Sequence, residues 1–384
     1  MSVIERPDAT SKRPGPEFSI RPATLEDIDG LVELERQCFT SDQISRRQFR
    51  WMIVRANARL NVCVRENFLL GYVLVLFHKG TSLARLYSLA VSPSLRGSGL
   101  GQQLLAVAEE LAIEHACVYL RLEVDPRNIR AVTLYERHGY TRFGTLEDYY
   151  QDHGDALRYQ KRLQITPPGI SRSVPYYEQT LDFTCGPASL IMAMRALDPA
   201  LQADRTLEVQ LWRESTTIYM TSGHGGCSPH GLALAAHRRG FACRLMLSHT
   251  GPLFLDGVRR ADKKAVLELV HDDFMKQVAE AGIPLRSASF NSAELIATLS
   301  CGCVPLVLIS SWRFNASKAP HWVVLVAADD TFVYLHDPDV DAHLSKAPGD
   351  TQSVPVRIDD FDRMIHFGQS RMQAALCLCP NSTE

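Results

Sequence analysis

The sequence predicts a two-domain chain, with an α/β domain built on a mixed sheet flanked by helices, followed by an α+β domain. Its 384 residues exceed the usual size of one domain. Strand-like and helix-like segments alternate over 18–163, which is typical of α/β architecture. The stretch "QITPPGISRS" at 164–173 is rich in Pro and Gly, so we expect a linker there. Residues 1–17 are polar and form a predicted flexible tail, and 174–384 form the second domain.

Hydrophobic periodicity gives the expected elements in order. In the first domain, helical patterns begin at Thr24 and Ser45 and recur at 99–116 and 128–138, and strands are expected at 60–66, 69–78, 83–91, 117–124, 140–147 and 155–162. In the second domain, helices are expected at 185–197, 228–239 and 262–281, and strands at 304–311, 320–328 and 331–337.

Composition excludes several classes of partner. The net charge is −2, with 41 basic and 43 acidic residues, so no nucleic-acid or anionic-membrane partner is predicted. The N-terminus lacks the apolar core of a signal peptide, and the longest apolar run, at 68–77, is about half the roughly 20 residues of a membrane span. The 10 Cys are thinly spread, which favours a reducing cytoplasm over a disulfide framework.

A glycine-rich loop is expected at the start of one helix in the first domain. "LRGSGLG" at 95–101 follows a predicted strand and contains the pattern R-x-x-G-x-G, carried by Arg96, Gly99 and Gly101. Glycines allow close approach of the backbone, and free N–H groups at a helix N-terminus bind phosphate oxygens. Such loops also close ordinary turns, so both interpretations remain open on this stretch alone.

A second motif in this domain is "NIRAVTLYERHGY", which matches N-x-x-A-x-x-L-Y-x-x-x-G-[FY] at Asn128, Ala131, Leu134, Tyr135 and Gly139. Together with the loop, it resembles the GNAT acetyltransferases over roughly 18–163. The resemblance implies acetyl-CoA as co-substrate.

The resemblance also implies roles for individual residues. The pyrophosphate would lie on Arg96, Gly97, Ser98, Gly99, Leu100 and Gly101, and the pantetheine arm along Leu89, Ala90 and Val91. Asn128 would help to hold the cofactor, and Tyr135 would protonate the leaving thiolate.

Glu123 and the segment "DYYQDHGDALRY" at 148–159 resemble the ribosomal-protein N-terminal alanine acetyltransferases. There, a Glu at this point serves as general base toward an N-terminal amine, which reacts only when neutral. The alternative for Glu123 is a salt-bridged strand residue. Tyr149 and Tyr150 either line a peptide groove or pack at the strand edge. The loop 38–45 lacks the Pro-Trp pair of many N-terminal acetyltransferases, which leaves the peptide substrate open.

The second domain contains a candidate nucleophile in "QTLDFTCGPASL", where Cys185 starts a predicted helix. The helix dipole favours a thiolate there. Pro187 suits the first turn, and Gly186 is expected to leave room for a substrate carbonyl. The Cys185 N–H and the Gln179 amide are expected to converge on one oxyanion.

A base for this nucleophile is expected at His321, which starts a strand, and Asp337 ends the next one. Two adjacent antiparallel strands would place the two side chains together, so that the carboxylate orients the imidazole. The order Gln, Cys-Gly-Pro-Ala, His-Trp and Asp-Pro resembles the bacteriocin-processing, papain-like cysteine peptidases, although Thr184 stands where they often carry Asp. The alternative for Cys185 is a buried structural thiol.

Other chemistry-bearing residues are given structural roles. His224, Cys227 and His230 have no convincing fourth ligand nearby, so no metal is predicted, and Ser228-Pro229 is expected to start a helix. The Cys pairs at 301–303 and 377–379 are expected to pack in the core, with a redox pair as the alternative. His336 is expected to face away from the site.

These observations predict a bifunctional cytoplasmic enzyme acting on a peptide or protein. An acetyl-CoA-dependent N-acetyltransferase, for a peptide or small amine, is fused to a Cys-His-Asp peptidase or amidase. Two alternatives remain: the second domain is a non-catalytic peptide-binding module, or the first is an acetyl-CoA sensor that regulates the peptidase.

Overall fold

The computed structural model describes residues 18–380 except 67, 79, 164–168, 217–224, 254–259, 311–319, 341–350 and 369. The chain divides into two compact units, the first holding most residues before Gln160 and the second most of those from Gln160 onward. The predicted tail and half of the predicted linker lie outside the described residues. The domain boundary at 164–173 therefore stays a prediction.

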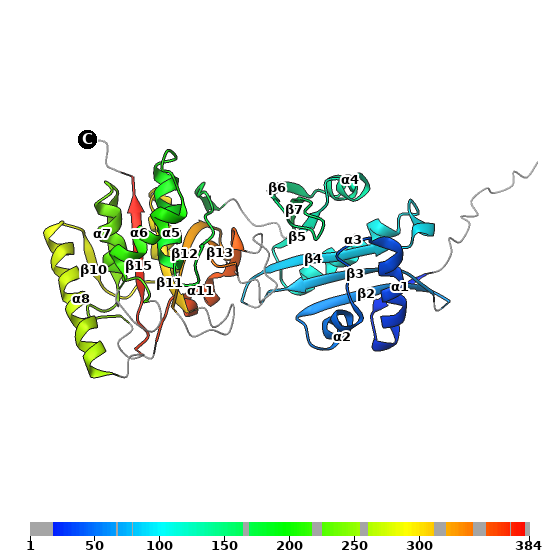
Figure 1. Cartoon of the computed structure of the whole chain (residues 1–384), viewed down its shortest axis with the longest axis horizontal. Helices are drawn as coiled ribbons and strands as arrows, with labels where there is room; N and C mark the ends of the chain where they lie inside the picture. The colour runs from blue at the N-terminus through cyan, green and yellow to red at the C-terminus, as the bar shows by residue number, and fades with distance from the viewer. Residues whose placement is uncertain are drawn as a thin grey trace, which may run out of the picture. The chain divides into compact units, whose positions relative to one another are not determined.

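The first unit is built on a seven-stranded sheet in the order β1-β2-β3-β4-β5-β7-β6 (Figure 1). Its strands are β1 Ser19–Pro22, β2 Ala58–Arg65, β3 Phe68–Phe77, β4 Leu83–Val91, β5 Tyr119–Val124, β6 Thr141–Leu146 and β7 Ala156–Arg162. Its helices are η1 Leu25–Asp27, α1 Ile28–Cys38, α2 Arg46–Val54, η2 Pro93–Leu95, α3 Leu100–Glu114 and α4 Ile129–Arg137. Each helix and strand predicted for this region is present, with its ends shifted by a few residues.

Local sequence explains the starts of these helices. Ser45 begins α2 through a capping box, in which its side chain and that of Gln48 each accept a backbone N–H of the other residue. Apolar side chains of α1 and α2, including Leu31 and Phe49, are buried against alternate residues of β2 and β3. This packing covers one face of the sheet.

The second unit is built on an eight-stranded sheet in the order β10-β9-β15-β11-β12-β13-β14, with β8 paired to β12. Its strands are β8 Ile170–Ser171, β9 Ala242–Leu247, β10 Leu285–Ser287, β11 Val304–Ser310, β12 Pro320–Ala328, β13 Phe332–His336, β14 Val354–Arg357 and β15 Ala374–Cys379. Its helices are α5 Cys185–Leu197, α6 Arg205–Ser215, α7 Pro229–His237, α8 Ala261–Glu280, α9 Ser292–Ser300 and α11 Ile358–Met364. Two apolar clusters lie in this unit, drawing on alternate residues of the same strands.

Some elements of the second unit were not predicted. The predicted elements of this unit are α5, α7, α8, β11, β12 and β13. The elements that were not predicted are α6, α9, α11, β8, β9, β10, β14 and β15. Part of the predicted linker is also regular, because Ile170 and Ser171 pair with Ala328 and Ala327 of β12. The short β8 therefore starts the second sheet within the segment predicted to be a linker.

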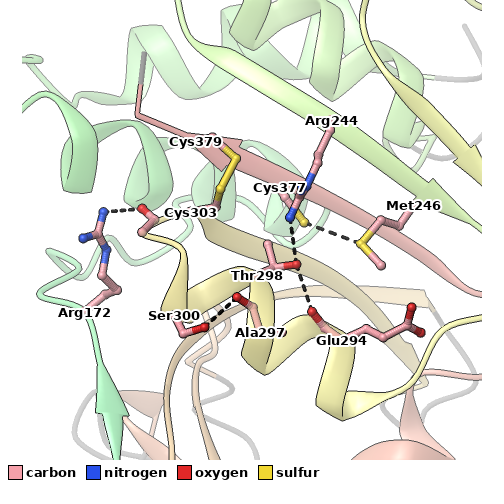
Figure 2. Close-up of a disulfide and its surroundings, with 11 residues drawn as sticks. Arg172, Arg244, Met246, Glu294, Ala297, Thr298, Ser300, Cys303, Cys377 and Cys379 are labelled. Carbon is pink, nitrogen blue, oxygen red and sulfur yellow. Dashed lines mark hydrogen bonds between the residues drawn. A yellow bond between two sulfur atoms is a disulfide. The ribbon is translucent and has the colours of Figure 1, made fainter. Parts of the chain in front are cut away.

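A disulfide between Cys303 and Cys379 corrects the prediction for the two Cys pairs (Figure 2). Antiparallel pairing of β11 with β15 sets Val304 opposite Leu378. Cys303 precedes Val304 and Cys379 follows Leu378, so the two cysteines also lie opposite each other, with their Cα atoms 4.1 Å apart. Cys303 is buried, as expected, but it is bonded to Cys379, which is only partly buried. Cys377 is a buried free thiol, as predicted, whereas Cys301 is exposed, so core packing was the wrong expectation for Cys301.

The predicted fold class is confirmed by this architecture: a mixed sheet flanked by helices, followed by an α+β unit. Within the part of the chain that the structure describes, no helix has the length and apolar character to cross a membrane.

Candidate active sites

Cys185 is the first residue of α5, where the sequence placed it. Its thiol is partly exposed. The next residue, Gly186, faces protein rather than open space: an added Cβ would lie 3.0 Å from the Cys227 Cβ and 3.2 Å from Trp322 Cδ1. The prediction that Gly186 leaves room for a substrate carbonyl is therefore wrong. Glycine is needed there because α5 packs closely on its neighbours.

His321, on β12, and Asp337, the residue after the end of β13, lie together as predicted. The register of β12 with β13 pairs Val324 with His336, which places Asp337 diagonally across from His321. The His321 Nε2 atom lies 2.6 Å from Asp337 Oδ1, and both residues are buried. The carboxylate thus fixes the orientation of the ring and leaves Nδ1 for a second partner.

The Cys185 thiol is the other group that favours the charged form of this imidazole. Burial disfavours the charged ring, but the charge of Asp337 and its hydrogen bond, together with the Cys185 thiol, raise the pKa of His321 well above its ordinary value. An imidazolium beside a thiolate is the activated state of a cysteine nucleophile. The packing that assembles it includes a hydrogen bond from the Ser189 hydroxyl of α5 to the Trp322 carbonyl of β12, 3.1 Å long.

Gln179, the predicted oxyanion donor, lies in the loop before Cys185, and both its backbone and its side chain are hydrogen-bonded. Its backbone N–H donates to the Pro338 carbonyl at 2.9 Å, and its Nε2 donates to Asp339 Oδ1 at 3.3 Å. The Oε1 atom is buried without a hydrogen-bond partner among the described residues. An amide nitrogen has two N–H groups, so donation to Asp339 leaves one for an oxyanion.

The remaining histidines near this site have structural surroundings. His336 is buried; its Nδ1 accepts from the Ser353 N–H at 3.0 Å, and its Nε2 donates to the Val174 carbonyl at 3.0 Å. Burial lowers the pKa of His336 to about 4, which agrees with a neutral ring. Ser228 caps α7 and Pro229 is its first residue, as predicted. His224 lies outside the described residues, and no group of residues suited to a metal was found among the described ones.

The predicted phosphate loop of the first unit leads directly into α3. Gly97 and Gly99 both have φ +88°, a conformation that favours glycine, and an added Cβ at either position would meet no atom within 4 Å. The helix begins at Leu100, and its first N–H groups have no acceptor within the helix. An open, glycine-lined helix N-terminus fits a pyrophosphate. Leu89, Ala90 and Val91 end β4 just before this loop.

Asn128 and Tyr135 belong to α4, close to its two ends. The Asn128 side chain caps the helix by accepting the Ala131 N–H at 3.2 Å, so its position has a structural explanation as well as the predicted cofactor contact. Tyr135 is buried, and its ring lies 5.7 Å from that of Tyr140. Burial raises the pKa of the Tyr135 phenol to about 12, so it keeps its proton at neutral pH.

Glu123 is bound to a residue that the sequence analysis did not single out. Arg85 Nε donates to Glu123 Oε2 at 2.8 Å, and both side chains are about 5% exposed. Arg85 Nη2 also donates to the Tyr149 hydroxyl at 2.5 Å. The salt-bridged arrangement that the sequence left open is therefore present. Among the described residues, the carboxylate accepts its hydrogen bond at Oε2, so Oε1 is the oxygen left for a proton.

Arg85, Asp339 and Glu208 are the residues near these sites that the sequence analysis missed. Arg85 lies on β4 four residues before Leu89, where the predicted pantetheine contacts begin, and alternation along β4 was the available signal. Asp339 follows the Asp-Pro motif by one residue. Glu208 lies on α6, a helix that was not predicted, so no local pattern pointed to it.

The geometry defines an acyltransferase-type loop and helix in one unit and a cysteine-peptidase-type constellation in the other. Residues 174–379, more than half of the chain, match the family model described as Peptidase C39 like family. Residues 28–140 match the Acetyltransferase (GNAT) family. The chain therefore belongs to the Peptidase C39 like family through its second part and to the GNAT acetyltransferases through its first.

Individual relatives match the first part alone. A Bacillus subtilis protein, provisionally named a ribosomal protein bS18-alanine N-acetyltransferase, is 32% identical over 140 residues, which are 36% of this chain and 91% of that protein. An uncharacterized N-acetyltransferase of Methanocaldococcus jannaschii is 31% identical over 36% of this chain and 87% of its own length. The crystal structure of the Escherichia coli ribosomal-protein-S18-alanine N-acetyltransferase is 19% identical, with a TM-score of 0.36, covering 39% of this chain and 97% of that one.

Proposed function

We propose that the chain is a bifunctional enzyme. Its first domain transfers an acetyl group from acetyl-CoA to the N-terminal amine of a peptide or protein, and its second cleaves a peptide amide with Cys185. The observation that carries the second activity is the pairing of His321 Nε2 with Asp337 Oδ1 at 2.6 Å, with Cys185 as the other partner of the ring. Membership of both families supports the combination.

For acetyl transfer, the loop from Arg96 to Gly101 and the start of α3 would hold the pyrophosphate of acetyl-CoA. When bound, acetyl-CoA supplies the activated acetyl group. The protonated Tyr135 is suited to donate a proton to the leaving sulfur, because burial keeps its phenol neutral.

Glu123 is the proposed acceptor of the proton that the amine must lose. Arg85 binds one oxygen of this carboxylate and fixes its direction, which leaves Oε1 to accept the proton directly or through water. The Arg85 contact to Tyr149 links the same carboxylate to the segment proposed to line the peptide site. We propose that Arg85 orients Glu123 for proton transfer, and that the pair does more than stabilise the fold.

For amide cleavage, the Cys185 thiolate would attack the carbonyl carbon and form a C–S bond. The oxyanion would be stabilised by the Cys185 N–H and by the free N–H of the Gln179 amide. The imidazolium of His321 would give its proton to the departing amine as the C–N bond breaks, and a water molecule would then hydrolyse the thioester while His321 accepts its proton. Asp337 holds the ring through both steps.

The choice of acceptor follows from the relatives. The Bacillus subtilis and Escherichia coli proteins are named for acetylating an alanine of a ribosomal protein, so we propose peptides with N-terminal alanine as the first class to test. A cut by the second domain would expose a new N-terminal amine, which the first domain would then be able to acetylate.

The experiment is mass spectrometry of a peptide mixture incubated with the full chain, with and without acetyl-CoA. Cleavage without acetyl-CoA that disappears in Cys185→Ala, and acetylation that disappears in Tyr135→Phe, are the expected results. Acetylation without any cleavage by the wild type would favour a peptide-binding second domain. Cleavage that depends on acetyl-CoA, with no acetylated product, would favour a sensor.

A further inference from the structure

Glu208 is a fully buried carboxylate in the second unit, and the proposed mechanism does not use it. It lies on α6, within the first turn, at 0% exposure. A buried carboxylate is normally stable only when its oxygens accept several hydrogen bonds. The groups that donate hydrogen bonds to Glu208 therefore indicate its role.

All of these partners come from the loop that leads to Cys185. Glu208 Oε2 accepts from the Tyr177 hydroxyl at 3.0 Å and from the Thr180 hydroxyl at 2.7 Å. Glu208 Oε1 accepts from the Thr180 backbone N–H at 2.9 Å and from the Thr184 hydroxyl. One carboxylate thus binds both ends of the segment 180–184, which lies between Gln179 and Cys185.

A second contact from the same face of α6 holds the middle of this segment. Trp212 is one helical turn beyond Glu208, and its ring lies 5.0 Å from that of Phe183. Residues four apart on a helix lie on the same face, so α6 holds the loop by a polar and an aromatic contact. Thr184 stands where related peptidases often carry Asp, and its hydroxyl lies within hydrogen-bond distance of both the Glu208 carboxylate and the Leu181 carbonyl.

We infer that Glu208 is a positioning residue for the oxyanion side of the cysteine site. Its carboxylate fixes the loop so that the Gln179 amide and the Cys185 N–H point to the same place. The inference rests on the proposed peptidase function, because it assigns Glu208 a role in a site whose activity is itself proposed. The contacts of Glu208 are with Tyr177, Thr180 and Thr184 and do not include His321 or Asp337.

The chemistry of the partners explains why an ionised acid is suited to this position. Among the described residues, each group that bonds to the Glu208 carboxylate is an N–H or a hydroxyl, and the Thr184 hydroxyl also lies 2.8 Å from the Leu181 carbonyl. A glutamine in its place has one acceptor oxygen and an NH₂ group that must face former donors. The hydroxyls are able to rotate and accept, whereas the Thr180 backbone N–H is not. With its oxygen toward that N–H and its NH₂ toward the hydroxyls, Glu208→Gln keeps the volume of the side chain. It replaces charge-assisted hydrogen bonds by weaker neutral ones, which loosens the loop.

Two reagents that differ in their need for an oxyanion site test the inference on the full chain. Iodoacetamide alkylates a thiolate without forming an oxyanion. p-Nitrophenyl acetate acylates the same thiolate through an oxyanion and releases a coloured product. We expect Glu208→Gln to slow the acylation burst by roughly 10²-fold, as loss of an oxyanion donor does, and to change alkylation by less than about threefold.

A double substitution tests whether Glu208 acts through Gln179. If it does, Glu208→Gln should slow acylation much less in a Gln179→Ala background than in the wild type. Glu214→Gln is the matched control, because Glu214 lies on the same helix and pairs with Arg239 at 2.7 Å, away from the loop. That variant should acylate as the wild type does. Cys185→Ala gives the background for both reagents.

The outcomes separate failure of the inference from failure of the proposed function. If wild-type Cys185 shows neither an acylation burst nor fast alkylation at neutral pH, the proposed peptidase chemistry fails. If wild type shows both and Glu208→Gln acylates equally fast, the inference fails alone. It also fails if Glu208→Gln slows both reagents equally, or if the effects of Glu208→Gln and Gln179→Ala are fully additive, because either result indicates a general structural role.

Discussion

The two candidate sites differ in the residues that their functional side chains contact. In the cysteine site, His321 and Asp337 bind each other at 2.6 Å, and Cys185 is the further partner of the ring. In the acetyl-transfer site, two of the predicted residues have neighbours that explain their positions without chemistry. Asn128 caps a helix, and Glu123 is bound to Arg85.

This difference shows that different kinds of observation support the two activities. The cysteine site is supported by geometry among residues that are far apart in sequence and by the match of its part of the chain to a family model. The acetyl-transfer site is supported by sequence motifs and by relatives that are 31% and 32% identical, while the contacts of Asn128 and Glu123 also have structural explanations. Mutational tests are therefore most informative where these two kinds of support disagree, and Glu123 is such a place.

The largest effect is expected in acetyl transfer. Tyr135→Phe removes the proposed proton donor and Glu123→Gln the proposed acceptor, so each should lower kcat by roughly 10²–10⁴. Acetyl-CoA affinity, measured by calorimetry, should change little. Because burial raises the pKa of Tyr135 to about 12, the alkaline limb of the wild-type pH–rate profile should lie far above neutrality. A Glu123→Gln enzyme with wild-type turnover and pH dependence would reduce Glu123 to a structural partner of Arg85.

A somewhat smaller effect is expected for thiolate formation in the cysteine site. An ordinary Cys thiol, which titrates near 8.5, is ionised to well below 1% at pH 6, so His321→Ala should slow iodoacetamide alkylation there by roughly 10²-fold. Asp337→Asn should slow peptide turnover more than alkylation, since Asp337 mainly orients the ring. Identical pH profiles of alkylation in wild type and His321→Ala would show that the geometry of this site has no chemical consequence.

Sequence patterns predicted the parts of both sites that depend on neighbours along the chain. The helix start at Cys185, the strands carrying His321 and Asp337, and the glycine loop before α3 are local features, and all are present. The contacts of Glu208 depend instead on packing of α6 against a loop about 28 residues earlier. The Arg85–Glu123 pair joins strands separated by α3, so it required the sheet order, which no local pattern specifies.

The disulfide allows the two units to be compared in stability as well as in activity. Cys303 and Cys379 are separated by 76 residues, and closing a loop of that length stabilises a fold by about 4 kcal/mol. We expect Cys303→Ser to lower the free energy of unfolding of the second unit by about this amount in urea titrations without reductant. Cys301→Ser is the matched control, since Cys301 is a free, exposed thiol. If reductant leaves the wild-type unfolding curve unchanged, the disulfide does not form in solution.

Acid should also affect the two units differently. All the buried histidines among the described residues lie in the second unit: His230, His271, His321 and His336. Burial lowers the pKa of His230 and of His336 to about 4. Both rings are therefore neutral in the folded state near pH 6 and gain a proton on unfolding. The pKa of His321 is raised, so its contribution is fully present in acid and is lost only as pH rises.

The second unit should consequently lose stability as pH falls from about 6.5 to about 4, while the first should not show this loss. One pKa unit corresponds to about 1.4 kcal/mol, so His230 and His336 each contribute up to about 3 kcal/mol to the decline. His230→Gln should remove its share of the pH dependence. His237→Gln should not, because His237 is exposed on the same helix. Urea titrations at several pH values measure the slope, and equal slopes in wild type and His230→Gln would show that His230 is charged in the folded state.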